Sequence, residues 1–143
     1  MTWPLFAVLS ALFASLTAIF GKIGVQGIDS NLAVAIRTTV VLVFAWGLVM
    51  LQPGPGVQMS LSAISQRSWL FLFLSGLATG GSWLFYYRAL QMGPASRVAP
   101  IDKLSVALTV VLAFAILGEK PTFGSVLGGT LITAGVLVAA FVK

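Results

Sequence analysis

The stretch of residues 38–66, TTVVLVFAWGLVMLQPGPGVQMSLSAISQ, contains no charged side chain. It is apolar as far as Leu51 and then enters the helix-breaking segment 52–56, QPGPG. An α-helix rises about 1.5 Å per residue and the hydrocarbon core of a bilayer is about 30 Å thick, so about 20 uncharged residues can cross it. The stretch therefore predicts a transmembrane helix over residues 32–51, followed up to Ser68 by an exposed loop or a short surface helix.

Charge-free stretches at residues 1–21, 68–87 and 121–142 predict helices over residues 3–20, 69–90 and 121–142. No charged residue precedes Lys22, so the amino terminus lacks the basic region of a signal peptide and is interpreted as a retained first span. Pro121 is suited to the first turn of the last helix, because backbone N–H groups in a first turn have no partner within the helix and proline lacks this group.

The fourth span differs from the others. Only 15 uncharged residues separate Lys103 from Glu119, which is about 22 Å of helix and too short to cross. The helix must therefore begin near Val98, and we expect it over residues 98–117. It then carries Asp102 and Lys103 into the edge of the membrane.

The composition agrees with lipid as the solvent. Of the 143 residues 59% are hydrophobic and 8% are charged, whereas soluble domains carry about 25% charged residues. This excludes a cytosolic enzyme domain, a disordered segment and a nucleic-acid binder. Because the apolar runs are continuous rather than alternating, a β-barrel is excluded as well. We expect an all-α membrane protein, a bundle of five transmembrane helices in one domain over residues 1–143.

The chain contains no cysteine and no histidine. Disulfides, thiolate nucleophiles, zinc sites and imidazole acid–base catalysis are excluded by this inventory. The three carboxylates, Asp29, Asp102 and Glu119, lie far apart in the sequence, and no two share a spacing that suggests a metal pair. We therefore expect neither an enzyme nor a bound metal or cofactor.

Five spans place the two termini on opposite sides of the membrane. The side of the amino terminus carries two basic residues and the other side carries six: Lys22, Arg37, Arg88, Arg97, Lys103 and Lys143. By the positive-inside rule the carboxyl terminus is cytoplasmic. Without Arg37, Arg88 and Lys103, which fall in or beside spans, the counts are three against two. A chain with so small a bias can insert in both orientations.

Two helices carry stripes of small or polar residues. In the third span hydroxyl groups recur at offsets of 4, 7 and 11 residues, and glycines and aromatic residues run beside them. This pattern indicates either close helix packing or the wall of a substrate cavity. The fifth span has only a glycine stripe, which favours packing or dimerisation. The cavity candidates are Ser75, Thr79, Ser82, Trp83 and Tyr86, and the packing candidates are Gly76, Gly80, Gly124, Gly128 and Gly135.

Charged residues gather near the side of the membrane that holds the carboxyl terminus. Arg37 lies about five residues inside the second span, roughly 7.5 Å deep, where a charge is costly unless it is paired or wet. One interpretation is snorkelling, with an ion pair between Asp102 and either Arg37 or Arg88. The other is a water-filled mouth in which Arg37, Arg88 and Lys103 attract carboxylate- or phosphate-bearing solutes, and Asp102 holds an arginine or exchanges a proton.

Four segments together resemble the EamA-type domain of the drug/metabolite transporter superfamily. They are ASLTAIFGK at residues 14–22, WLFYYRALQMGPAS at 83–96, APIDKLS at 99–105 and LGEKP at 117–121. The resemblance extends over essentially the whole chain and is closest to the single-domain, five-helix members of bacteria and archaea. It implies an integral protein of the cell (inner) membrane.

The resemblance also implies an assembly. Most relatives have ten helices, two such domains in inverted topology around a central cavity, so this half is expected to need a second copy or a homologous half-transporter. Known substrates of the family include amino acids, metabolites, drugs and nucleotide sugars. The small four-helix exporters of the superfamily use a glutamate in their first helix, and the first span here has no acidic residue.

The sequence thus predicts a half-size secondary transporter of small metabolites or drugs that works as a dimer in the lipid bilayer. Two alternatives stay open. One is an accessory membrane subunit without transport of its own, docked on a partner through its glycine-rich helices. The other is a flippase for lipid-linked sugars, which would also need cationic mouths.

Overall fold

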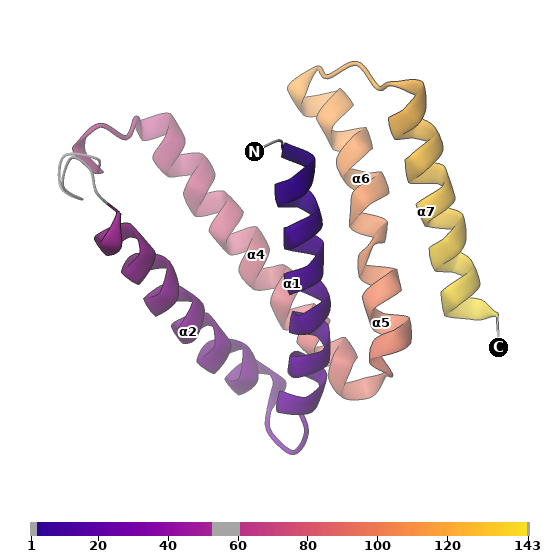
Figure 1. The fold of residues 1–143 in the computed structure, drawn as a ribbon, viewed down its shortest axis with the longest axis horizontal. Helices are drawn as coiled ribbons and strands as arrows, with labels where there is room; N and C mark the ends of the chain where they lie inside the picture. Colours follow the sequence, from indigo (N-terminus) through magenta and orange to yellow (C-terminus); the bar gives the residue numbers. More distant parts are fainter. Residues whose placement is uncertain (1–2, 53–60, 143) are drawn as a thin grey trace. The chain divides into compact units, whose positions relative to one another are not determined.

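The computed structural model describes residues 3–52 and 61–142, and in these ranges its regular structure is helical (Figure 1). Residues 53–60 of the predicted loop or surface helix, and Lys143, lie outside the described residues. Five helical stretches are long and apolar enough to cross a membrane: Trp3–Gly24, Ser30–Leu51, Gln66–Met92, Ala95–Leu117 and Phe123–Phe141. The prediction of an all-α protein with five transmembrane helices is confirmed.

Helix α1 covers Trp3–Gly24, α2 covers Ser30–Leu51 and α4 covers Gln66–Met92. The start of α2 lies two residues before the predicted one because Asp29 caps the helix. Its carboxylate accepts hydrogen bonds from the backbone N–H groups of Asn31 at 2.9 Å and Leu32 at 3.1 Å. A capping carboxylate also interacts favourably with the helix dipole. Asp29 thus has a structural role.

The fourth span consists of three consecutive segments, α5 (Ala95–Asp102), α6 (Leu104–Leu112) and the π-helical turn η1 (Ala113–Leu117). It begins at Ala95, three residues earlier than predicted. Between α5 and α6 the N–H of Lys103 bonds to the carbonyl of Pro100 at 2.9 Å, a tighter turn than the α-helical one. The helix interior contains Pro100, which lacks an N–H to donate.

The last helix, α7, covers Phe123–Phe141 and begins with a capping box. The hydroxyl of Thr122 accepts from the backbone N–H of Ser125 at 3.1 Å, and the hydroxyl of Ser125 accepts from the N–H of Thr122 at 2.9 Å. Pro121 therefore precedes the cap, and the prediction that it lies in the first turn is wrong. The cap places the helix start because its two hydroxyl groups satisfy two backbone donors, whereas the side chain of a proline has no acceptor to offer.

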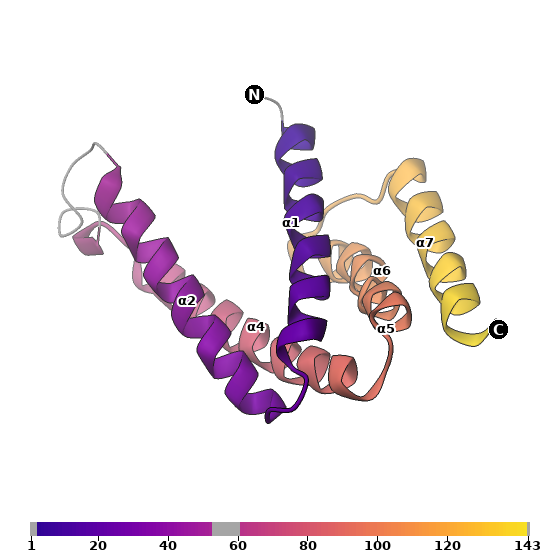
Figure 2. The ribbon, with the colours of Figure 1, turned by 60° about the horizontal axis from the view of Figure 1, so that its bottom comes forward.

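The chain divides into two compact units. The first comprises Met1–Ile23 and Met92–Lys143, and in it α7 packs against α5 and α6. The helices α1 and α7 run in the same direction and α5–α6 in the opposite one (Figures 1 and 2). The ammonium of Lys22, near the end of α1, donates to the carbonyl of Gly93 just before α5 at 2.8 Å. This bond ties α1 to the start of the fourth span.

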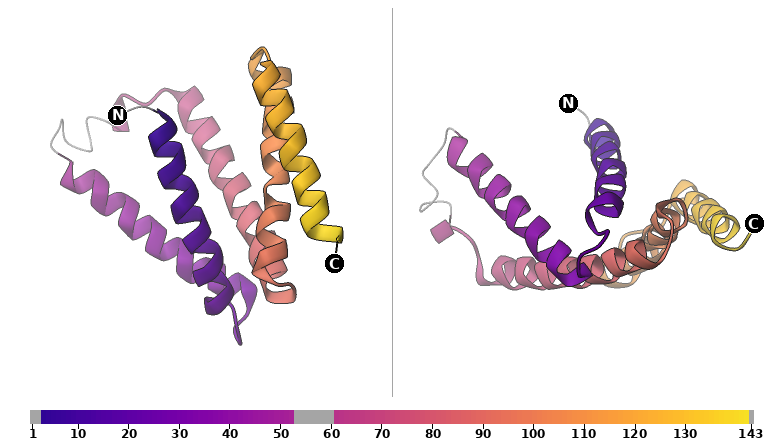
Figure 3. Two further views of the ribbon diagram at one scale, coloured as in Figure 1. Left: turned by 45° about the vertical axis from the view of Figure 1, so that its right-hand side comes forward. Right: turned by 90° about the horizontal axis from the view of Figure 1, so that it is seen from below.

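The second unit, Gly24–Gln91, is a hairpin of α2 and α4. The two helices are antiparallel, close together where α2 begins and α4 ends, and farther apart at their other ends (Figure 3). The buried side chains of the unit lie toward the close end, and they include Ala33, Val34, Tyr87 and Leu90. The packed part of this unit is therefore the end that holds the start of α2 and the end of α4.

Candidate functional site

Arg37 of α2 stacks on the aromatic residues of α4. Its guanidinium carbon lies 3.7 Å from the centroid of the Trp83 ring and 5.7 Å from that of the Tyr87 ring. Trp83 and Tyr87 are four residues apart and so share one face of the helix. The Tyr87 side chain is buried, and its ring meets that of Tyr86 edge to face at a centroid distance of 6.3 Å. The Arg37–Trp83–Tyr87 cluster therefore joins α2 to α4.

One nitrogen of this guanidinium has no hydrogen-bond partner. Nη1 of Arg37 is buried, and no described residue accepts a hydrogen bond from it. A desolvated cation–π contact contributes about 2 kcal/mol. Leaving a buried donor of a charged group unsatisfied costs about 1–3 kcal/mol or more. The cluster thus stabilises the charge through its face and leaves one buried donor at its edge without an acceptor.

The depth of Arg37 makes this unsatisfied donor more significant. The residue lies seven positions after Ser30, where α2 begins, which is about 10 Å along the helix axis. Charges inside a membrane span are expensive and usually face a bundle interior or a water-filled space. Since Asp29 is the only acidic residue of 24–91 and is used as a helix cap, this unit supplies no carboxylate of its own for Arg37.

Arg88, the second candidate cation of this unit, has a different environment. Its Nη1 donates to Oε1 of Gln91 at 3.1 Å, and Nε2 of Gln91 donates to the carbonyl of Ile28 at 2.6 Å. This relay ties the end of α4 to the turn before α2. Sequence analysis did not single out Gln91, although its place four residues after Tyr87 put it on the same helix face.

The predicted hydroxyl face of the third span lies on α4. The hydroxyl of Thr79 donates to the carbonyl of Ser75 at 2.8 Å, within its own helix. The side chain of Ser82 is exposed. Hydroxyls that bond to their own backbone still present a lone pair outward, so they can contact a solute but do not require one.

Gly76 and Gly80 precede Trp83 and Tyr87 along the same helical face. A Cβ atom added to either glycine would meet no described atom within 4 Å. These glycines therefore make no close contact with another helix among the described residues. The space beside them is open at the same face that holds the Arg37 stack.

Asp102 and Lys103 lie in the other unit, at the junction of α5 and α6. The ammonium of Lys103 is 3.2 Å from the carboxylate of Asp102, and the side chains are 53% and 36% exposed. An exposed pair of this kind contributes at most about 1 kcal/mol. An ion pair of Asp102 with Arg37 or Arg88 would join the two units, and it stays a prediction.

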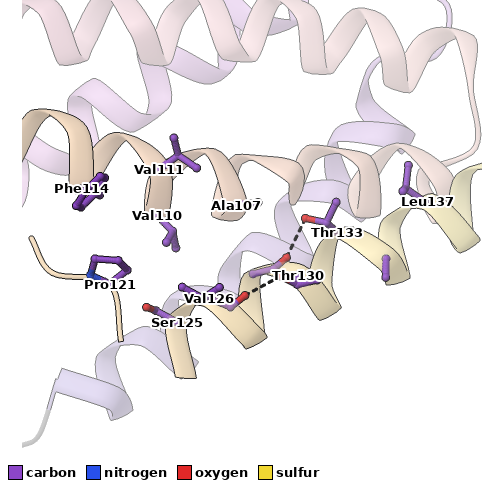
Figure 4. A pocket seen from close by; sticks show the side chains of 12 residues that line it. Ala107, Val110, Val111, Phe114, Pro121, Ser125, Val126, Thr130, Thr133 and Leu137 are labelled. Carbon is purple, nitrogen blue, oxygen red and sulfur yellow. Dashed lines mark hydrogen bonds between the residues drawn. The ribbon is translucent and has the colours of Figure 1, made fainter. Parts of the chain in front are cut away.

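An apolar groove lies between the fourth span and α7 (Figure 4). Its volume is about 540 Å³. The hydroxyls of Thr130 and Thr133 at its floor donate to the carbonyls of Val126 and Gly129, each within α7, so the groove offers few free polar groups. Sequence analysis did not predict it. The lining includes Ala107, Val110, Val111, Phe114, Pro121, Ser125, Val126, Gly129, Thr130, Thr133, Ala134 and Leu137.

The glycine that brings α7 close to α6 is Gly129, which the predicted stripe did not include. It is buried, and a Cβ atom on it would lie 4.0 Å from Cα of Ala107. A Cβ atom on Gly128 or Gly135 would meet no described atom within 4 Å, and one on Gly124 would meet only the hydroxyl of Thr122, at 4.0 Å. Any packing role of the predicted stripe therefore belongs to a contact outside this helix pair.

Comparison with known proteins decides the family. The chain matches the EamA-like transporter family over residues 1–141. It belongs to the EamA-like transporter family. This EamA-like chain is also 48% identical over 139 residues to a curated protein of Sinorhizobium sp named "Uncharacterized transporter in cobO 3'region", and the match covers 97% of this chain and 96% of that protein. No solved structure matched it.

Family membership confirms the resemblance drawn from the four sequence segments. Together with the five membrane-crossing helices it identifies the EamA-like chain as a multi-pass integral membrane protein. The family and the name of the relative both indicate a membrane transporter rather than an enzyme.

Proposed function

We propose that this chain is a half-size secondary transporter of small metabolites or drugs that works as a dimer around a central cavity. The observation that carries the proposal is the length of the relative named as a transporter, 96% of which this five-helix chain covers. Because carriers hold their solutes between two repeats, a chain with one set of five helices needs a second set.

The open glycine faces support a second copy. Gly76 and Gly80 on α4, and Gly128 and Gly135 on α7, leave space within 4 Å that no described residue fills. Small residues let membrane helices of two chains approach closely. The odd number of spans and the small charge bias are compatible with two copies in opposite orientations, related as inverted repeats are.

The cavity of the proposed dimer has its wall on α4. Ser75, Thr79, Ser82 and Tyr86 supply hydroxyl groups that orient a solute, and Trp83 supplies an aromatic surface. Arg37, Arg88 and Lys103 attract an anionic group toward the mouth, and Asp102 holds a cation or exchanges a proton. The proposed location is the cell membrane of a bacterium or archaeon.

The orientation of the chain is tested with single cysteines, because the natural sequence contains none. Trp3→Cys and Val142→Cys variants are labelled separately in intact cells with a membrane-impermeant maleimide. Partial labelling at both positions is expected if both orientations occur. Full labelling at one position and none at the other would contradict an inverted homodimer and would require a partner of opposite topology.

Transport is tested with the purified chain in liposomes, screened with a mixture of radiolabelled amino acids, organic acids and cationic drugs. We expect uptake of at least one class of solute by the chain alone, and Arg37→Ala is expected to abolish it without loss of insertion. Normal transport by Arg37→Ala would contradict a role for this residue. No transport, together with co-purification of a different membrane protein, would favour the accessory subunit.

A further inference from the structure

We propose that the Arg37–Trp83–Tyr87 cluster is a binding site for a carboxylate, so that the solute class of this carrier is the small organic acids. The inference rests on the proposed function and names its substrate class. It does not depend on how the two units of the chain are arranged, because all three residues belong to Gly24–Gln91.

The geometry of the cluster fixes the guanidinium of Arg37 in place. The guanidinium carbon of Arg37 lies 3.7 Å from the centroid of the Trp83 ring and 5.7 Å from that of the Tyr87 ring. A ring stacked on a guanidinium covers its face and leaves the N–H groups in its plane free to donate. Stacking also removes the rotational freedom of a long side chain before the ligand arrives. The donors are therefore preorganised, as a binding site requires.

The guanidinium of Arg37 lacks a partner for one of its donors. Nη1 of Arg37 is buried and unpaired among the described residues, and the only acidic side chain of its unit caps α2. A planar guanidinium edge matches the two oxygens of a carboxylate, which it binds through parallel hydrogen bonds. An oxyanion is thus the ligand that satisfies both the charge and the unpaired donor, and it reaches Nη1 when the side chains that cover this edge move aside.

Arg67 serves as an internal control for Arg37. Arg67 also lies over an aromatic ring, with its guanidinium carbon 5.8 Å from the centroid of Phe71. It is exposed at the start of α4, where water and lipid headgroups can satisfy every donor. The same side chain near the surface therefore has no need of a specific ligand.

Binding can be followed through Trp83 itself. The other three tryptophans, Trp3, Trp46 and Trp69, are exposed and can be replaced by phenylalanine. The full chain carrying these replacements is purified in a neutral maltoside detergent, and the emission of Trp83 is titrated with butyrate and with butyramide. The two probes have nearly the same shape and differ in charge.

We expect a saturable change of Trp83 emission with butyrate, at least tenfold weaker binding of butyramide, and loss of the butyrate response in Arg37→Gln but not in Arg67→Gln. Arg37→Lys keeps the charge without the planar fork and is expected to bind about tenfold more weakly. It serves as the second variant if Arg37→Gln does not elute as a single folded species. A butyrate response that survives in Arg37→Gln, or no response in the parent, overturns the proposal.

Two further arms distinguish other sources of the oxyanion. In nanodiscs of phosphatidylcholine with increasing phosphatidylglycerol, an unchanged butyrate affinity supports a solute site. Emission that follows the phosphatidylglycerol content and loss of the butyrate response would assign Arg37 to lipid headgroups and overturn the proposal. A response that appears only in Asp102→Asn would assign Arg37 to an internal ion pair and overturn it as well.

The proposed function and this inference fail separately. If the chain transports cationic or neutral solutes in liposomes while butyrate does not bind, the carrier function stands and the carboxylate site is wrong. If butyrate binds through Arg37 but no solute is transported, the site stands and the carrier function is wrong.

Discussion

Gly129 of α7 faces Ala107 of α6, and a Cβ atom on the glycine would lie 4.0 Å from Cα of the alanine. This is an ordinary van der Waals separation. The two backbones therefore leave room for a methyl group at this point and for little more. In a membrane, where lipid is as apolar as leucine, such close contact is what holds helices together.

Gly129→Ala is expected to be neutral or to stabilise the chain by up to about 1 kcal/mol, because alanine favours the helix and its methyl group fits. Gly129→Leu is expected to destabilise it by about 1–3 kcal/mol, since the larger side chain must force α6 and α7 apart. Thermal unfolding in maltoside detergent measures both effects. Equal stability of the leucine and alanine variants would contradict the close contact.

Gly128→Leu is the matched control and also tests the proposed dimer. A Cβ atom at Gly128 meets nothing within 4 Å among the described residues, so leucine there is not expected to destabilise the single chain. If this face packs on a second copy, the same change is expected to shift the protein toward monomer. Light scattering in detergent and cross-linking in membranes measure the shift. An unchanged dimer fraction would place the dimer contact elsewhere.

Gln91→Leu is expected to destabilise the hairpin of α2 and α4. The variant loses the 2.6 Å bond to the carbonyl of Ile28 and the contact with Arg88, each worth about 0.5–1.5 kcal/mol. Gln66→Leu, at the exposed start of α4, is the control for the loss of a glutamine. Thermal unfolding measures the difference between them, and equal stability of the two variants would contradict the relay.

Asp102→Asn separates a structural role from a transport role. Because the pair with Lys103 is exposed, its loss is expected to cost less than about 1 kcal/mol of stability. If Asp102 exchanges a proton or holds a cation of the mouth, transport in liposomes falls strongly while thermal unfolding is unchanged. Normal transport would remove Asp102 from the proposed mechanism, and a large loss of stability would show that its main partner is not Lys103.

Much of the helical architecture was predictable because it depends on local properties. Charge-free runs long enough to cross a bilayer indicated four spans, a shorter run extended past Asp102 and Lys103 indicated a fifth, and five are present in the described residues. The ends were less predictable, since caps determine them. The carboxylate of Asp29 and the Thr122–Ser125 capping box place two helix starts that the positions of charges alone did not.

The candidate site was predictable in its residue types but not in its contacts. Helical spacing placed Trp83 beside the hydroxyl face, and the depth of Arg37 marked it as unusual, but nothing in the sequence paired the two. The relay through Gln91 and the groove beside Gly129 were missed for the same reason. Each depends on residues that are distant along the chain.

Hydropathy and length, read along the chain, were thus enough to establish a five-span membrane protein, because the free energy of entering lipid is nearly a sum over the residues of each segment. The neighbours of each side chain depend instead on how far every helix turns about its axis and where it crosses the next. In an apolar solvent many such rotations expose helix surfaces of similar hydropathy, so hydropathy does not choose among them. Close packing at Gly129 and the stack of Arg37 on Trp83 distinguish one of them.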